Sequence, residues 1–416
     1  MTAARTFVTG VLLLAVAAAL LLPGTRTNEL ACLWDSDTLR AEAAGAPGMV
    51  ETIVGRFDRY PPLYYEMRLE RVAKELETDP TDLAAYDDAG VACDRLGRYD
   101  EAVAWMARKR RALDAAPDEE HEYRYLANLG TFHAHRWISS GADRSDLADI
   151  QRARDLIDQA IQLNPDAHFG RERYQLMALD WILRPPAREP LYDAPSNILA
   201  ADPSLGVHQG SFFLGQLEGT DHADAGEGLA GLVALGNAWN SFDVFFSLGG
   251  ALQGGGDSSI AALAWFRAEE IANDGGRSLH PDYDASGFEA DRYARAHLSS
   301  AAPLERFYKE ARAEADARHA ARTAYITTRL EQGQHPDTHP DFFAAWAEPS
   351  SMPEMPDGFF GLGGHDATIA KAALVAGGLL LFLLANAIAL TVWLVRRLKR
   401  RRAHRAAAPT PATAPA

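Results

Sequence analysis

The sequence has little cysteine and few runs of β-branched residues. Its 416 residues include two cysteines, Cys32 and Cys93, so a paired C-x-x-C metal or redox motif is excluded. In an exported protein these two residues form either one disulfide or two buried free thiols, and the sequence leaves both open. Because Leu/Ala-rich periodic segments lie between Gly and Pro pairs, the predicted fold class is all-α.

Motifs of common catalytic sites are also absent. The sequence contains no G-x-x-x-x-G-K-[ST], H-E-x-x-H or G-x-S-x-G, and each of these patterns supports a particular chemistry. Gly226, Gly228 and Gly231 match G-x-G-x-x-G, but the dinucleotide-binding motif follows a strand, and QLEGTDHADA before Gly226 is not a strand. These glycines therefore predict close helix packing. We expect no catalytic residue, no cofactor and no metal, and hence not an enzyme.

The histidines give weak metal signals. His133 and His135 are two residues apart in TFHAHRW, so on a helix they face roughly opposite sides and do not easily share one metal ion. His335 and His339 each precede Pro-Asp, a pattern typical of turns with a capping aspartate. We predict that His133 is a packed, hydrogen-bonded residue and that His335 and His339 lie in turns, rather than that they bind a metal.

Basic residues are outnumbered by acidic ones. The chain has 41 Lys and Arg against 57 Asp and Glu, a formal net charge of −16. Residues 32–367 hold 31 of these basic residues and 56 of the acidic ones, which gives −25. A field of this sign opposes nucleic acid and anionic lipid headgroups, and suits a basic partner. We expect a protein or peptide partner, no nucleic acid and no small-molecule substrate.

One apolar segment near the C-terminus predicts a transmembrane helix. Residues 372–395 carry no charged side chain, and this length crosses a hydrocarbon layer roughly 30 Å thick. The following RRLKRRRAHR contains basic residues and no acid. By the positive-inside rule this tail lies in the cytoplasm, so the chain contacts the membrane through its own C-terminal helix.

A second apolar segment lies near the N-terminus. FVTGVLLLAVAAALLL follows Arg5 and precedes Pro23-Gly24, the order of regions in an export signal. Cleavage and retention as an anchor both stay open. The predicted localisation is therefore the cell membrane, single-pass or two-pass, with the main domain extracytoplasmic.

Three stretches have the spacing of antiparallel helix pairs. In YDDAGVACDRLGRYDEAVAWM, small and large residues recur at helical intervals on both sides of Gly97, which suits a left-handed helix end. Residues 123–165 repeat this pattern with a longer turn and end in AIQLNP, and residues 241–274 repeat it without an insertion. The matching positions are Tyr86, Ala89, Gly90, Cys93, Tyr99, Ala102, Met106, Leu126, Leu129, Gly130, Ala153, Ile157, Ala160, Pro165, Phe245, Leu248, Gly249, Leu252, Gly256, Ala261, Trp265 and Ala268.

This spacing resembles the tetratricopeptide repeat (TPR) family, and with its membrane segments the chain resembles a membrane-anchored TPR protein of bacterial type. The likeness covers roughly a third of the chain. It implies a helical-repeat solenoid with a concave partner-binding surface, and it implies service in the assembly of envelope complexes. Lys109 departs from the pattern, which has alanine at its position.

The resemblance also implies where a partner binds. In the family, first-helix residues that packing does not use line the concave groove, and the corresponding residues here are Asp87, Val91, Asp94, Arg95, Ala127, Thr131 and Ala134. Asp87 and Val91 differ from the basic and amide residues with which some relatives hold a carboxylate.

The leading hypothesis is thus a protein-interaction scaffold. The alternative is a metal-binding or enzymatic module in the irregular segments 184–222 and 334–366, and a third possibility is a structural spacer. The predicted plan is a signal peptide or anchor (1–31), a TPR-like block (32–183, repeats near 83–116 and 123–165), an irregular connection (184–222), a second helical block (223–333, repeat 241–274), a Pro/Gly-rich spacer (334–367), the transmembrane helix (368–395) and a basic tail (396–416).

Overall fold

The computed structural model describes residues 33–44, 47–165, 171–186, 195–201, 222–298 and 301–356. The predicted signal or anchor, the apolar segment 372–395, the basic tail and Cys32 lie outside this part of the chain. Within it, no helix is both long enough and apolar enough to cross a bilayer. Cys93 is a buried free thiol, and burial raises its pKa to about 12.

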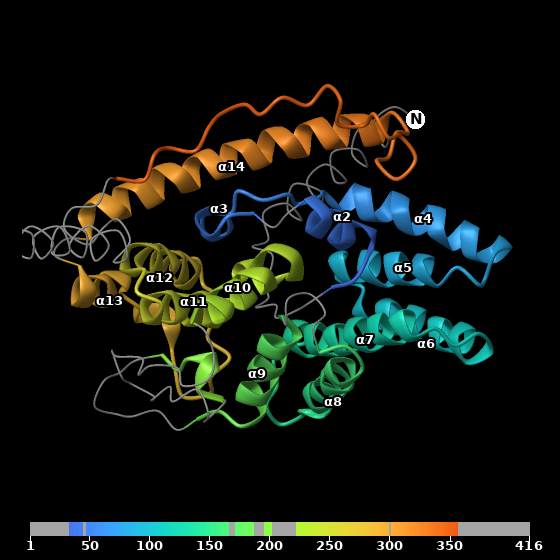
Figure 1. The fold of residues 1–416 in the computed structure, drawn as a ribbon, viewed down its shortest axis with the longest axis horizontal. Helices are drawn as coiled ribbons and strands as arrows, with labels where there is room; N and C mark the ends of the chain where they lie inside the picture. The colour runs from blue at the N-terminus through green and yellow to red at the C-terminus, as the bar shows by residue number, and fades with distance from the viewer. Residues whose placement is uncertain are drawn as a thin grey trace, which may run out of the picture. The chain divides into compact units, whose positions relative to one another are not determined.

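Helices form the regular structure of the described residues, and no strand occurs among them (Figure 1). This confirms the predicted all-α class. The helices are α2 (Ser36–Ala44), α3 (Met49–Val54), α4 (Pro62–Thr78), α5 (Leu83–Arg95), α6 (Tyr99–Ala115), α7 (Glu119–Ser139), α8 (Ala148–Leu163), α9 (Arg171–Leu183), α10 (His222–Gly231), α11 (Phe242–Gly254), α12 (Ser258–Asn273), α13 (Ala290–His297) and α14 (Ala302–Glu331).

Helices that follow one another in the chain pack against one another. The closest neighbours include α5 with α6, α7 with α8 and α11 with α12, so the three predicted helix pairs are present. In the first pair, residues close together in the sequence form the turn that joins the two helices. Gly97 has a φ of +72°, and the Arg98 N–H donates to the Cys93 carbonyl at 2.8 Å, which ends α5 in a left-handed turn. The next helix then runs back along α5.

Two glycines of the G-x-G-x-x-G stretch, Gly228 and Gly231, serve helix packing, as predicted. They lie on α10, where a Cβ added to Gly228 would fall 2.1 Å from a ring carbon of Tyr174 on α9. A Cβ on Gly231 would fall 2.3 Å from the side chain of Arg171. The absence of side chains at these two positions therefore lets α10 approach α9 closely.

This contact gives a matched pair of variants. Gly228→Ala is expected to destabilise the protein by about 1–3 kcal/mol, because the methyl group overpacks against the Tyr174 ring. Gly226→Ala on the same helix is expected to stabilise it by about 0.5–1 kcal/mol, since its Cβ would meet only Leu252 at 3.5 Å and Met49 at 3.7 Å. Urea unfolding of both variants measures the difference. Equal effects would contradict the close approach.

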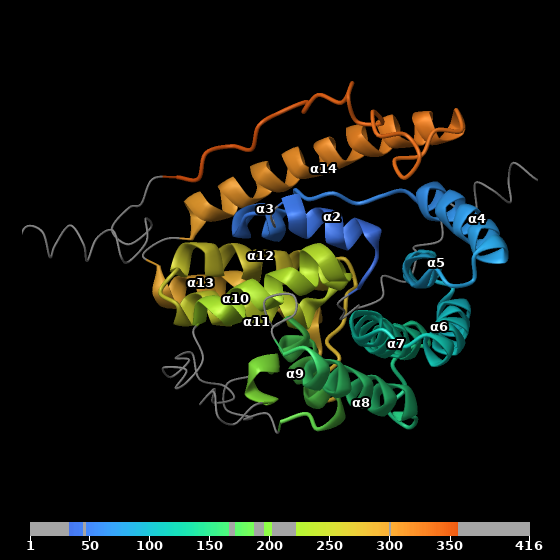
Figure 2. The same ribbon diagram turned by 45° about the vertical axis from the view of Figure 1, so that its right-hand side comes forward.

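The chain after α14 turns back and runs along that helix (Figure 2). Phe342 is 1% exposed and belongs to a core cluster with Tyr64, Ile326 and Leu330. His335 is also buried. The sequence predicted a spacer from residue 334 onward, yet its first part packs into the fold. The reason is that aromatic side chains between the prolines have a core to enter.

Candidate functional site

The predicted partner-binding residues lie inside the fold. Asp87, Val91, Asp94, Ala127, Thr131 and Ala134 are each at most 2% exposed. Arg95 is partly buried. All seven lie on α5 or α7, and six of them are buried. The structure does not leave them open to solvent.

The chain's own residues 33–35 fill this groove. The Trp34 N–H donates to Asn128 Oδ1 at 2.8 Å, and Asn128 Nδ2 donates to the Trp34 carbonyl at 2.9 Å. The Trp34 ring meets Tyr123 edge to face, with ring centroids 5.2 Å apart. One side-chain amide thus satisfies both backbone groups of an extended residue, which is how a helical surface holds a peptide without a strand.

Two predicted site carboxylates have partners in the groove wall. Lys109 Nζ lies 2.7 Å from both carboxylate oxygens of Asp87, and His135 Nδ1 lies 2.8 Å from Asp94 Oδ1. The Lys109 side chain has no exposed surface. The lysine that departs from the repeat pattern therefore neutralises the aspartate beside it, and both carboxylates take part in packing between helices.

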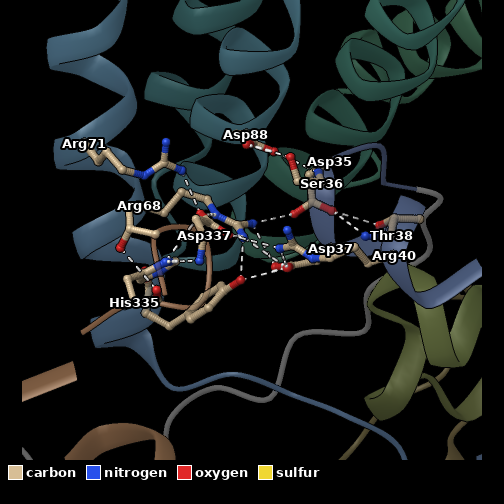
Figure 3. Close-up of polar contacts among 12 residues, drawn as sticks. Asp35, Ser36, Asp37, Thr38, Arg40, Arg68, Arg71, Asp88, His335 and Asp337 are labelled. Carbon is tan, nitrogen blue, oxygen red and sulfur yellow. Dashed lines mark hydrogen bonds and ion pairs between the residues drawn. The ribbon is translucent and has the colours of Figure 1, made fainter. Parts of the chain in front are cut away.

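Beside the groove, a cluster of charged residues surrounds Arg68, whose side chain is fully buried (Figure 3). Arg68 Nη1 lies 2.8 Å from Asp37 Oδ2 and 3.3 Å from Asp35 Oδ2. Its Nε and Nη2 donate to the two oxygens of Asp337 at 2.8 and 2.7 Å. We call Asp35, Asp37, Arg40, Arg68, Arg71 and Asp337 the Arg68 cluster; it contains three arginines and three aspartates.

The Arg68 cluster joins parts of the chain that are far apart in sequence. Asp35 and Asp37 precede or begin α2, Arg68 lies on α4, and Asp337 follows α14 (Figure 3). Arg71 and Arg40 also reach Asp337, at 2.7 and 3.0 Å. A planar guanidinium with five donors suits this role, because it can bind several carboxylates in fixed directions.

The aspartates of this region differ in pKa. Burial would raise the pKa of Asp337, but Arg68 holds it well below its usual range. Burial and the neighbouring charge of Asp37 raise the pKa of Asp35. The adjacent Asp88, which accepts from the Ser36 N–H at 2.8 Å, has its pKa raised to about 6, mainly by burial. The cluster is thus held by the ionised Asp37 and Asp337.

A pocket of about 470 Å³ opens beside the Arg68 cluster. Arg95 is the predicted site residue that lines it, and Arg95 Nη1 donates to Asn237 Oδ1 at 2.6 Å. Charged and aromatic side chains form the walls: Asp35, Asp37, Arg40, Asp58, Tyr60, Tyr65, Arg95, Arg322, His339, Phe342 and Phe343, with Thr38, Ala41, Ala234, Leu235, Pro336 and Pro340 between them. A cavity with both signs of charge and aromatic walls suits a peptide better than a purely apolar ligand.

His133 and His335 are hydrogen-bonded, as expected of His133. His335 Nδ1 accepts from the Asp337 N–H at 3.1 Å, so its Nε2 carries the proton toward the Tyr64 carbonyl at 3.1 Å. His133 Nδ1 lies 2.9 Å from Asp149. Across the described ranges, no group of three or more His, Cys, Asp or Glu side chains has the arrangement of a metal site.

A second cavity, of about 450 Å³, lies between the turn after α7 and the loop after α12. Asp243 holds part of this loop, since it accepts from Ser278 Oγ at 2.6 Å and from the Leu279 N–H at 2.8 Å. Burial raises the pKa of Asp243 to about 7, although both hydrogen bonds lower it. The loop is therefore held by a carboxyl group that titrates near neutral pH.

This carboxyl group predicts a pH dependence of stability. The unfolded group titrates near pH 4 and the folded one near pH 7. Between these values the folded state binds the extra proton, so its contribution to stability falls as the pH rises. Asp243→Asn keeps both hydrogen bonds when its amide donates to Ser278. We expect wild type to lose about 2–4 kcal/mol more than this variant between pH 5 and pH 8.

Urea unfolding at the two pH values measures this loss. Asp257→Asn is the matched control, because Asp257 caps the N-terminus of α12 at a partly exposed position. It controls for the effect of replacing an aspartate by asparagine elsewhere in the fold. Parallel curves for wild type and Asp243→Asn would contradict the assignment.

Sequence reasoning missed Arg68, Asn128 and Asp337. Arg68 lies among the apolar positions of α4, and Asn128 lies between Leu126 and Leu129, which match the repeat pattern. A polar residue among such apolar positions is the signal that could have identified both. Asp337 was expected only to cap a turn. Comparisons with protein families, with curated proteins and with solved structures find no match for this chain.

Proposed function

We propose that this chain is a membrane-anchored, extracytoplasmic scaffold of the TPR type that binds a protein or peptide partner. Consecutive helix pairs support the repeat assignment, because stacked pairs expose long surfaces rather than an enclosed reaction site. The apolar segment 372–395 and the basic tail support the anchor and its orientation. From the resemblance to TPR proteins, we add the assembly of envelope complexes to this proposal.

The observation that carries this proposal is the way α5 and α7 hold residues 33–35. Asn128 binds both backbone groups of Trp34, and the neighbouring Leu33 is 1% exposed. Helices α5 and α7 thus bind an extended segment by the chemistry that a partner peptide would need. Here the occupant is intramolecular.

The pocket beside the Arg68 cluster is the surface that we assign to the partner. It lies next to the groove, because Arg95, at the end of α5, and Asp35, which follows Trp34 in the chain, both line it. Its Asp58 and Arg40 side chains are 45% and 53% exposed. A partner with both a basic and an acidic group therefore has accessible ion-pair partners here.

Capture of partners by cross-linking the full chain in its own membranes tests the proposal. Charge reversal at Asp87 or Asp94 is unsuitable, because both side chains are buried and the variants would unfold. Asp58→Lys and Arg95→Glu are expected to lose the captured partner. Arg111→Glu is the matched control, since Arg111 is exposed on α6, outside the pocket. Equal capture by all three variants would overturn the assignment of this surface, and absence of any captured protein would overturn the scaffold.

A further inference from the structure

The chain after α14 has a buried part and an exposed part. Residues 335–342, which we call the root, include the buried His335 and Phe342 and the Asp337 carboxylate bound by Arg68. Residues 343–350, which we call the strap, run without helix or strand along α14 (Figure 2). Most strap residues are exposed. The root is thus part of the core, whereas the strap lies on the surface.

Polar contacts fix the far end of the strap. Arg318 on α14 binds Glu348 with two parallel hydrogen bonds, Nε to Oε2 at 2.7 Å and Nη2 to Oε1 at 2.8 Å. Arg56 Nη2 donates to the Ser350 carbonyl at 3.1 Å. Ser350 Oγ donates to Glu314 Oε1 at 2.7 Å. The bidentate pair has the geometry by which arginine selects a carboxylate.

Aromatic contacts fix the near end. The Arg322 guanidinium lies 4.5 Å from the centre of the Phe343 ring, and the Trp346 ring meets Tyr325 with centroids 5.4 Å apart. Phe343 and Trp346 therefore occupy an arginine–tyrosine surface on α14, as an aromatic side chain of a bound peptide would.

Without the strap, arginines outnumber carboxylates on the surface beneath it. Arg56, Arg318 and Arg322 face Asp58 and Glu314, so three arginines meet two carboxylates. Glu348 of the strap supplies the third carboxylate. Without the strap this surface therefore has one more positive than negative side chain, although the whole chain has a formal net charge of −16. It complements an acidic ligand.

The strap is held weakly compared with the root. Glu348 is 46% exposed and Arg56 is 21% exposed, and solvent-accessible pairs of this kind contribute little to stability. Phe342, by contrast, anchors the root in the core. The strap can therefore leave α14 while the root stays in place.

We propose that α14 and Arg56 form a docking strip for an extended acidic peptide that has an aromatic residue two positions before a glutamate, as Trp346 and Glu348 have. The strap occupies this strip in cis, and a partner peptide of the same chemistry displaces it. This inference rests on the proposed partner-binding function, at a surface next to the pocket. It names the chemistry of the partner segment.

Competition sets the size of the expected effect. A tethered segment has an effective concentration on the order of 1 mM, so a free peptide with a dissociation constant near 0.1 mM is weakened about tenfold by the strap. Releasing the strap should therefore raise the affinity for the free peptide about tenfold. The probe is a fluorescent peptide with the sequence of residues 340–352, and its anisotropy is measured with the full chain.

The strap-release variant combines Trp346→Ala with Glu348→Gln. It should bind the peptide about tenfold more tightly than wild type does. Glu354→Gln is the matched control, because Glu354 is exposed and follows the strap. It should bind as wild type does. Circular dichroism and thermal melting check that each variant keeps its fold.

Two substitutions test the strip itself. On the release background, Arg318→Gln should weaken peptide binding about two- to fivefold, because the partly exposed bidentate carboxylate contact is lost. A peptide with glutamine in place of glutamate should lose a similar factor on the release variant alone, which tests the same contact where Arg318→Gln disturbs folding. If the release variant binds no more tightly than wild type, or if the glutamine peptide binds equally well, the docking strip is refuted. Peptide binding without capture of any cellular partner would refute the scaffold but keep the strip.

Discussion

Replacing Arg68 with methionine is expected to lower the free energy of unfolding by about 3–5 kcal/mol. The substitution keeps much of the side chain's apolar volume but leaves Asp37 and Asp337 without the guanidinium that holds them ionised. Both carboxylates lie at most 14% exposed, so water cannot replace the lost partner. Equilibrium urea unfolding, followed by circular dichroism, measures the change.

Two further substitutions on α4 test whether the loss comes from the Arg68 guanidinium itself. Arg68→Lys keeps the charge but lacks the planar fork that binds two carboxylates at once, so its loss should fall between those of wild type and Arg68→Met. Lys74→Met removes an exposed ion pair with Glu70, whose two side chains are 70% and 71% exposed, and should leave stability unchanged within the error of the measurement. A loss for Arg68→Met no larger than that for Lys74→Met would show that the Arg68 cluster does not hold the three segments together.

The helix pairs could be predicted from sequence because their signals are local. Gly97 and the residues around it specify a left-handed turn between two amphipathic helices, and α5 and α6 begin and end close to the predicted bounds. The same holds for α11 and α12, which match the third spacing. Within such pairs, contacts lie three, four or seven residues apart or across a short turn, so one sequence window contains them.

That the chain's own residues 33–35 fill the groove could not be predicted in this way. Trp34 and Asn128 are 94 residues apart, and residues 33–35 have no helical period that would mark them as a ligand. A groove that the repeat spacing leaves open is therefore closed by a segment from outside the repeats. Non-local contacts of this kind depend on the whole chain.

Charged residues misled the sequence reasoning in a related way. A lysine or an aspartate considered alone is rarely buried, so no single position marks Lys109 and Asp87 as a buried pair. Buried together they neutralise each other, and Arg68 does the same for the aspartates around it. A prediction from single positions cannot detect such pairs, because each charge is tolerated in the interior only through its partner.

Replacing Lys109 with alanine gives the second large expected effect. Repeat spacing alone predicts a neutral or favourable change, since alanine is the residue that the repeat pattern has at this position and is the best helix former. The structure predicts a loss of about 3–5 kcal/mol, because the Asp87 carboxylate is 2% exposed and would be left buried without its cation. Thermal and urea unfolding separate these two outcomes by their sign.

A double-mutant cycle with Asp87→Asn then identifies the cause. In wild type, Asp87→Asn should destabilise, because Lys109 is left buried without a carboxylate. In the Lys109→Ala background the same substitution should stabilise, since it removes the unpaired charge while its amide can still bond to Asn128, which donates to Asp87 at 3.1 Å in wild type. Arg111→Ala on the exposed side of α6 should stay within about 0.5 kcal/mol of wild type. If Asp87→Asn destabilises both backgrounds equally, the two residues act independently; a change of sign shows that Lys109 stabilises the fold through Asp87.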